Sequence, residues 1–363
     1  MAAIPCLFMR GGTSRGPFFN RADLPTDQNL LAELLIAVLG AGHPLNIDGI
    51  GGGNAVTTKV AILSPSDDPW ADIDYFFAQV AVLEAHVDFK PTCGNILSAV
   101  GPAAIEMGLV PIQGEQTRVK IKSTNTGALA EAVVQTPDGK VEYEGTAQIA
   151  GVPGTAAPVI IKFMNVIGSK TGTLFPTGKT IDLIDGIKVS CMDAAMAMVI
   201  GRAADFGITG YETREELDGN KALFERFEKV RIKAGAQMGL GDVSQSVLPK
   251  FGLLAPARSG GTVAARYFMP WQTHPSYAVT GAICTGACLL LPGTVAEGLV
   301  DPVPPAQASG AFNVKIEHPS GDLDIAFDIA MADGEYSLKS AGLLRTARKL
   351  FTGEVHVPSK ALP

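Results

Sequence analysis

The sequence predicts an α+β protein of two domains, and three observations support this prediction. At 363 residues the chain is too long for one ordinary core and fits two domains of middling size. Short runs rich in β-branched and aromatic residues, separated by Gly, Pro and Asn turns, predict strands with a few helices between them. The second half repeats the order of the first: strands, a Gly/Cys turn, then an Ala-rich helix.

A stretch punctuated by Gly and Pro, residues 168–186, separates the two halves. We therefore expect an N-terminal domain at residues 1–185 and a C-terminal domain at residues 186–342. The end of the chain, about 343–363, is expected to return to the first domain as a strand. Two such halves facing each other would place two helix N-termini at one interdomain cleft, which suits a small polyanion.

The expected elements follow from local patterns along the chain. A helix at 28–39 is bounded by Asp27 as N-cap and by Gly40 after its end. Period-2 patterns and turn signals predict strands at 4–9, 56–63, 73–82, 118–122, 128–134, 141–148, 159–165, 187–191, 251–255, 262–268, 313–317, 323–329 and 354–357. Further helices are expected at 215–238, 280–292 and 342–350.

Composition narrows the classes of function. Hydrophobic residues make up 47% and charged residues 18%, which is typical of a core-forming globular protein. The net charge of −7 and the lack of a basic stripe argue against nucleic acid as a partner. No apolar run is long enough to span a membrane, and the first residues do not resemble a signal peptide, so we expect a cytoplasmic protein without a membrane partner.

The five cysteines and five histidines show no metal-binding spacing. The odd number of cysteines without a CxxC pair favours free thiols in a reducing cytoplasm. The glycine run at 48–54 leads into a strand and not a helix, so it is not a dinucleotide fingerprint, and a GK[ST] P-loop is absent. We therefore expect no metal and no cofactor.

The turn Cys93-Gly94-Asn95, followed by a small-residue run, places a thiol at a predicted helix start. Free N–H groups at such a start stabilise both a thiolate and a carboxylate. A free cysteine is most often an inert core thiol. The Gly-Asn neighbours favour Cys93 over the other four cysteines as an acid/base group acting on a small polycarboxylate.

Two further segments carry candidate groups. Residues 10–16 combine three glycines with Thr13, Ser14 and two arginines, among them Arg10. This loop could bind a carboxylate or be a solvated turn, and composition leaves both open. Strand alternation places Lys59 on one face with Ala and Leu neighbours, where a partly desolvated amine is a usable acid or base. Its pattern alone favours a lysine that reaches solvent from an edge strand.

Several motifs, taken together and in order, resemble the PrpF family, which includes methylaconitate isomerase, methylitaconate delta-isomerase and 4-oxalomesaconate tautomerase. The motifs are MRGGTSRG at 9–16, IDGIGG at 47–52, TKVAI at 58–62, CGNIL at 93–97 and PTG at 176–178. The segment GVPGTAAP at 151–158 and the opening around Cys6 are most similar to the 4-oxalomesaconate tautomerases of gallate and protocatechuate breakdown.

The resemblance implies a diaminopimelate-epimerase-like fold: two pseudo-symmetric domains, each a curved, mostly antiparallel sheet around a central helix. It implies a cofactor-independent proton shift next to carboxylates, with the active site in the interdomain cleft. It also implies that Lys59 and Cys93 are the acid/base pair and that Gly94 and Asn95 bind a carboxylate. For Lys59 the resemblance therefore favours a catalytic role over a lysine that only reaches solvent.

The expected substrate is a small unsaturated tricarboxylate, with 4-oxalomesaconate ahead of 2-methylaconitate and methylitaconate. We expect its carboxylates to dock on the loop from Arg10 to Ser14, on the N–H groups behind Cys93, and on Arg266. The sequence leaves open which of the lysine and the cysteine is the base. In epimerase relatives the second half supplies a second cysteine. Aligning the TGAC segment puts Ile283 at that position, which favours a one-thiol, one-lysine isomerase.

Two other functions stay open at this point. An epimerase of amino or hydroxy acids would need a second thiol within reach. A non-catalytic accessory protein that binds aconitate-like acids would need neither Lys59 nor Cys93 for chemistry. An exposed sheet edge would allow a homodimer, although no residue marks such an interface.

Overall fold

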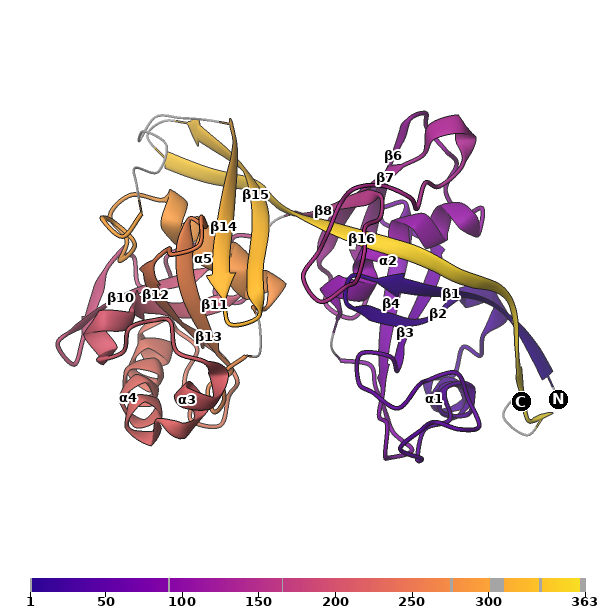
Figure 1. Cartoon of the computed structure of the whole chain (residues 1–363), viewed down its shortest axis with the longest axis horizontal. Helices are drawn as coiled ribbons and strands as arrows, with labels where there is room; N and C mark the ends of the chain where they lie inside the picture. The colour runs from indigo at the N-terminus through magenta and orange to yellow at the C-terminus, as the bar shows by residue number, and fades with distance from the viewer. Residues whose placement is uncertain are drawn as a thin grey trace. The chain divides into compact units, whose positions relative to one another are not determined.

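The computed structural model describes residues 2–90, 92–164, 166–274, 277–300, 310–332 and 335–359 (Figure 1). Pro91, the first residue of the cysteine turn, lies outside these ranges. The chain forms two compact units, Met1–Met164 with Leu343–Pro363, and Asn165–Gly342. This division falls earlier than residue 185, and β9 (Asp182–Ile184) belongs to the second unit, where it pairs with β10 (Ile187–Asp193).

The first unit contains the helices α1 (Gln28–Leu39) and α2 (Gly94–Glu106). Its strands are β1 (Ala2–Gly11), β2 (Ser14–Asn20), β3 (Lys59–Pro65), β4 (Ile73–Val80), β5 (Val87–Asp88), β6 (Gln116–Ser123), β7 (Leu129–Gln135), β8 (Pro158–Met164) and the later part of β16 (Glu335–Val357). Two short 3-10 helices are η1 (Arg21–Asp23) and η2 (Pro137–Gly139).

The second unit holds α3 (Arg214–Gly219), α4 (Lys221–Gln237), α5 (Val279–Leu290) and the 3-10 helix η3 (Ala203–Phe206). Its strands are β9, β10 (Ile187–Asp193), β11 (Ala197–Arg202), β12 (Lys250–Pro256), β13 (Val263–Phe268), β14 (Gly310–His318), β15 (Gly321–Ala332) and the first part of β16.

The two units share one order of strand pairings. In the first unit β1–β2, β3–β4 and β6–β7 are antiparallel, whereas β2–β3 and β4–β6 are parallel. In the second unit β10–β11, β12–β13 and β14–β15 are antiparallel, whereas β11–β12 and β13–β14 are parallel. Each parallel pair needs a crossover, and helices lie in these crossovers: α1 and α2 in one unit, α3–α4 and α5 in the other.

The sheet of the first unit has a helix on each face. Ala61 and Leu63 of β3 pack in the same core as α2, whereas Val60 and Ile62 pack in the core that contains α1. This alternation confirms the predicted faces of β3, so Lys59 is on the α2 face. The α1 helix begins and ends as predicted, with Asp27 accepting two backbone N–H bonds and Gly40 in the left-handed region at φ 69°.

Close packing explains why α2 contains Gly101. A Cβ there would lie 2.9 Å from side-chain carbons of Ala132 and Val134 on β7, so only glycine lets the helix approach the sheet. Ten residues in a row, Ile96–Ile105, are buried in this helix.

Three predicted elements are wrong. Residues 141–148 form an isolated bridge between Ala147 and Ala156 instead of a strand. The helix expected at 215–238 is two helices, because Asn220 ends α3 and its side chain caps α4 by accepting from the Leu223 N–H. The helix expected at 342–350 is part of β16, whose pairing with β1 runs from Ala347 to Val357 and outweighs local helix propensity.

Candidate active site

Cys93 is the N-cap residue of α2, with extended backbone angles of φ −132° and ψ 108°. Its carbonyl accepts the N–H of Leu97 at 2.9 Å, which is the first hydrogen bond of the helix. The Cys93 side chain makes no capping hydrogen bond, and the N–H groups of Gly94 and Asn95 in the first turn have no intrahelical acceptor. The half-buried thiol therefore lies beside free donors and the positive end of the helix dipole.

Polar contacts fix the turn that carries the thiol. The buried Tyr75 hydroxyl donates to the carbonyl of Cys93 at 3.4 Å, and the Ser123 hydroxyl donates to Thr92 Oγ1 at 3.3 Å. Burial raises the pKa of Tyr75 well above its usual range, so this hydroxyl stays a neutral donor at physiological pH. The two bonds attach the turn to β4 and β6.

The donor-rich segment 10–16 is a tight hairpin and not an extended loop: β1 ends at Gly11 and β2 begins at Ser14. The hairpin touches the first turn of α2. A Cβ on Gly11 would lie 2.6 Å from the Asn95 carbonyl oxygen, and one on Gly12 would lie 2.3 Å from Asn95 Oδ1. Gly12 also has a left-handed φ of 54°. Ser14 is buried and Thr13 is exposed beside this contact.

Lys59 opens β3 on the α2 face, and two neighbours hold its ammonium group. Nζ donates to Gln79 Oε1 at 2.7 Å and lies 5.3 Å from the centroid of the Phe77 ring. The Gln79 amide in turn donates to the carbonyl of Thr58 at 3.1 Å, which fixes its orientation. These two contacts fix the position of Nζ on the α2 face of the sheet.

The structure brings Lys59 and Cys93 to the same face of the same unit. Phe77 beneath Lys59 and Tyr75 beside Cys93 are neighbouring α2-facing residues of β4, with ring centroids 6.4 Å apart. The Lys59 amine and the Cys93 thiol thus lie on either side of a short apolar surface formed by Phe77 and Tyr75.

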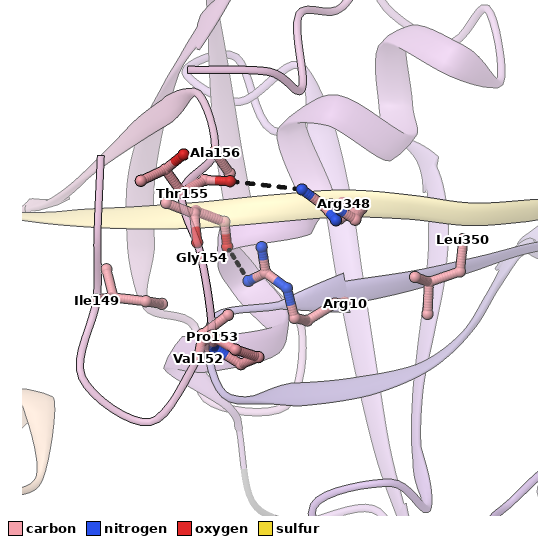
Figure 2. A pocket seen from close by; sticks show the side chains of 10 residues that line it. Arg10, Ile149, Val152, Pro153, Gly154, Thr155, Ala156, Arg348 and Leu350 are labelled. Atoms are coloured by element: carbon pink, nitrogen blue, oxygen red, sulfur yellow. Dashed lines mark hydrogen bonds between the residues drawn. The ribbon is translucent and has the colours of Figure 1, made fainter. Parts of the chain in front are cut away.

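Arg10 faces away from this site. Together with Arg348 it lines a pocket of about 210 Å³ that also contains the segment Val152–Ala156 (Figure 2). Nη1 of Arg10 donates to the carbonyls of Gly12 at 2.8 Å and Thr346 at 3.0 Å. Burial, with a smaller contribution from the Arg348 charge, lowers the pKa of Arg10.

Arg266 belongs to β13 of the second unit. Its Nε donates to the carbonyl of Glu212 at 2.8 Å and its Nη1 to that of Ala265 at 3.0 Å. Burial lowers the pKa of Arg266, although the nearby Glu212 opposes this effect. The described contacts of this guanidinium with acceptors are therefore to backbone oxygens.

The other four thiols are buried. Burial raises the pKa of Cys6 to about 12 and that of Cys288 to about 11, and it raises the pKa of Cys191 and Cys284 further. The alignment that put Ile283 at the second helix start is corrected: α5 begins after Ala278, and Ile283 lies inside the helix. The residue at the second start is an alanine and carries no thiol.

Within the described ranges, no three His, Cys, Asp or Glu side chains are arranged to hold a metal ion. The same part of the chain contains no helix that is long and apolar enough to cross a membrane.

Sequence reasoning missed Tyr75 and Gln79. Both lie on β4, and Gln79 is directly opposite Lys59 in the antiparallel pair β3–β4. The alternation of β4 was visible in the sequence, but its register against β3 was not. Only the register identifies Gln79 as the partner of the lysine.

The similarity of this chain to known proteins extends over nearly its whole length. The family model described as PrpF protein matches residues 1–358. An Escherichia coli K12 protein named as an isomerase, YbhH, is 51% identical over 358 residues, which are 99% of this chain and 100% of that protein. The 4-oxalomesaconate tautomerase of Pseudomonas putida is 46% identical over 354 residues, 97% of this chain and 95% of that protein.

A solved structure shows the same fold. The crystal structure of a methylitaconate-delta-isomerase superimposes with a TM-score of 0.88 at 33% identity, covering 100% of this chain and 97% of that one.

Proposed function

The chain belongs to the PrpF family, and on this premise we propose that it is an isomerase that moves a proton in 4-oxalomesaconate without a cofactor. The resemblance inferred from the motifs is thereby confirmed at the level of the family. The observation that carries the proposal is the placement of Lys59 and Cys93 on one face of one unit, on either side of Phe77 and Tyr75. The finer fold assignment, a diaminopimelate-epimerase-like domain for each unit, is supported by the shared order of pairings.

We assign the two acid/base roles from the local environments. Cys93 lies at the start of α2, and we assign it the role of the base that removes a C–H proton next to a carboxylate. Gln79 and the Phe77 ring hold the Lys59 amine in place, and we assign Lys59 the role of the acid. The Lys59 proton is delivered to another atom of the conjugated intermediate.

The step balances without an oxidant or reductant. One C–H bond breaks as the S–H bond of Cys93 forms, and the electron pair moves into the conjugated system as a dienolate. One N–H bond of Lys59 breaks as the new bond to hydrogen forms on the product. Proton exchange with water returns the thiol and the amine to their starting states.

The substrate carboxylates are proposed to bind donors near the thiol. The N–H groups of Gly94 and Asn95 and the hydroxyls of Thr13 and Ser14 supply such donors, and the glycines of the hairpin allow its close approach to α2. The orientation of Arg10 favours a role in shaping this hairpin through its bond to the Gly12 carbonyl. Arg266 stays a predicted carboxylate contact.

Ultraviolet absorbance of purified protein with 4-oxalomesaconate tests the proposal, because the conjugated chromophore changes as the proton moves. We expect rapid turnover of this substrate and slower turnover of 2-methyl-cis-aconitate and methylitaconate. The likeness to a methylitaconate-delta-isomerase makes methylitaconate the second candidate. If none of the three changes in absorbance, the isomerase proposal fails and a binding protein for such acids is favoured.

A further inference from the structure

Two faces of β16 can be told apart by their contacts. Thr346, Arg348 and Leu350 all line the pocket away from α2, and Figure 2 shows Arg348 and Leu350 there. Between them, Ala347 packs in the α2 core, and Lys349 Nζ donates to Glu106 at the end of α2 at 2.7 Å. Odd-numbered residues of this segment therefore face α2. Arg345 is the next odd-numbered residue.

Contacts of neighbouring residues indicate the level of Arg345 along α2. Lys349 reaches Glu106 at the end of the helix, whereas Ala347 is paired with Gly11, which abuts Asn95 in the first turn. The N–H of Gly12 donates to the carbonyl of Thr346 at 2.9 Å, so the hairpin stays beside β16 up to that residue. Moving towards lower residue numbers, the strand thus advances from the end of α2 to its start. Arg345, one step beyond Thr346, comes level with the helix start.

The guanidinium of Arg345 carries several N–H donors, but few acceptor atoms among the described residues lie within hydrogen-bond distance of it. Nη1 donates to the carbonyl of Leu344 at 3.0 Å, and no Asp or Glu among the described residues forms an ion pair with it. Burial lowers the pKa of Arg345 to about 10, so the group is still a cation at neutral pH. Arg345 is half-buried, and a partly desolvated cation without a carboxylate is less stable than one that an anion joins.

We propose that Arg345 binds a carboxylate of the substrate beside the N-terminus of α2. This inference rests on the proposed function, since it supplies the positive charge that a tricarboxylate needs next to Lys59. A guanidinium presents parallel N–H groups that match both oxygens of a carboxylate, which a lysine cannot do. Arg345 would thereby set the orientation of the substrate over the thiol.

The chain offers a matched control in Arg348. It lies three residues further along the same strand, is exposed, and belongs to the opposite face, where it donates to the Thr155 carbonyl at 3.4 Å. Removing either guanidinium changes the net charge by the same amount. Only Arg345 is expected to affect binding of the substrate.

Calorimetric binding of tricarballylate, a saturated tricarboxylate that has no double bond to shift, tests the inference together with steady-state kinetics on 4-oxalomesaconate. We expect Arg345→Gln to weaken tricarballylate binding and to raise KM by about tenfold to a hundredfold, with a smaller change in kcat. Arg345→Lys should give an intermediate loss of affinity, because it keeps the positive charge but loses the parallel N–H groups of the guanidinium. Arg348→Gln should stay within about twofold of the wild type.

Unchanged affinity and KM in Arg345→Lys or Arg345→Gln would overturn the inference, and so would equal losses in Arg345→Gln and Arg348→Gln. If Arg345→Gln does not fold, Arg345→Lys decides. The result separates this inference from the proposed function. Binding of tricarballylate that depends on Arg345, in a protein that turns over none of the three substrates, would refute the isomerase and keep the carboxylate contact. Turnover with a KM that does not change when Arg345 is replaced would keep the isomerase proposal and refute the carboxylate contact.

Discussion

The helices α2 and α5 occupy the same place in the shared strand order, yet their beginnings differ. The α2 helix starts at a half-buried Cys93, with Tyr75 bonded to its carbonyl. The α5 helix starts at Ala278, and its two thiols, Cys284 and Cys288, are buried within the helix. The repeated plan therefore has a half-buried thiol at the helix start in one unit and only buried thiols within the helix in the other. The position of a cysteine on its helix, and not its Gly-rich neighbourhood, distinguishes the two.

Glycines serve the two helices differently. At α2, Gly11 and Gly12 let a polar hairpin approach the helix start. At α5, a Cβ on Gly281 would lie 2.3 Å from the Tyr267 ring and one on Gly286 would lie 2.2 Å from the Phe327 ring. The first pair shapes a site, whereas the second admits aromatic rings into a core.

The largest expected difference between the helices is catalytic. Cys93→Ser should lower kcat by roughly a hundredfold to ten-thousandfold, the usual contribution of a general acid or base. Cys284→Ala and Cys288→Ala should keep kcat within about twofold of the wild type, because neither thiol lies at a helix start. Steady-state kinetics of the three variants checks this. A loss of kcat in Cys284→Ala as large as in Cys93→Ser would contradict the proposed difference between the thiols of α2 and α5.

Thiol alkylation should distinguish Cys93 at the start of α2 from the buried thiols of α5. We expect iodoacetamide at pH 8 to modify Cys93 alone in the folded protein, as read by peptide mass spectrometry. Burial raises the pKa of Cys288 to about 11, so at pH 8 only about one molecule in a thousand carries that thiolate. A raised pKa keeps the thiol neutral until the pH approaches that value, so labelling of Cys288 should rise only in strong alkali. Modification of Cys284 or Cys288 at pH 8 would contradict the buried assignment.

A glycine substitution in α5 should affect stability and not chemistry. Gly286→Ala forces a methyl group into the Phe327 ring and should lower the free energy of unfolding by about 1–3 kcal/mol. Activity per folded molecule should be unchanged. Denaturant unfolding gives the first quantity. Gly353→Ala is the control, because a Cβ there meets nothing within 4 Å. Equal stability of the two variants would show that the ring moves aside freely.

The smallest expected effect concerns a buried pair in the second unit. Thr285 and Tyr277 share a hydrogen bond of 2.8 Å between their hydroxyls. Thr285→Val keeps the shape and removes one partner, so the free energy of unfolding should fall by about 1 kcal/mol with kcat/KM unchanged. Thermal unfolding and kinetics together check this. A tenfold loss of kcat/KM would mean that α5 contributes more than packing.

Local sequence was enough to predict much of this fold. The caps of α1 and the alternation of β3 are set by neighbouring residues, and both agree with the structure. The segment 342–350 shows the limit. Its leucines and alanines suit a helix, but pairing with β1, which is distant in the chain, makes it a strand.

The candidate site divides in the same way. The place of Cys93 at a helix start followed from its Gly-Asn turn, and the face of Lys59 followed from alternation. Composition marked the Arg10 segment as rich in donors but could not show that the Arg10 guanidinium faces away from α2. Gln79 and Arg345 depend on strand register, which no local pattern in the sequence specifies.

Solvent exchange in heavy water tests most directly whether Lys59 and Cys93 are the acid/base pair. We expect the wild type to place deuterium in the product of 4-oxalomesaconate, as read by proton NMR. Lys59→Met and Cys93→Ser, each folded, should lose turnover. Full turnover and full deuterium incorporation in both variants would contradict the assignment of this pair.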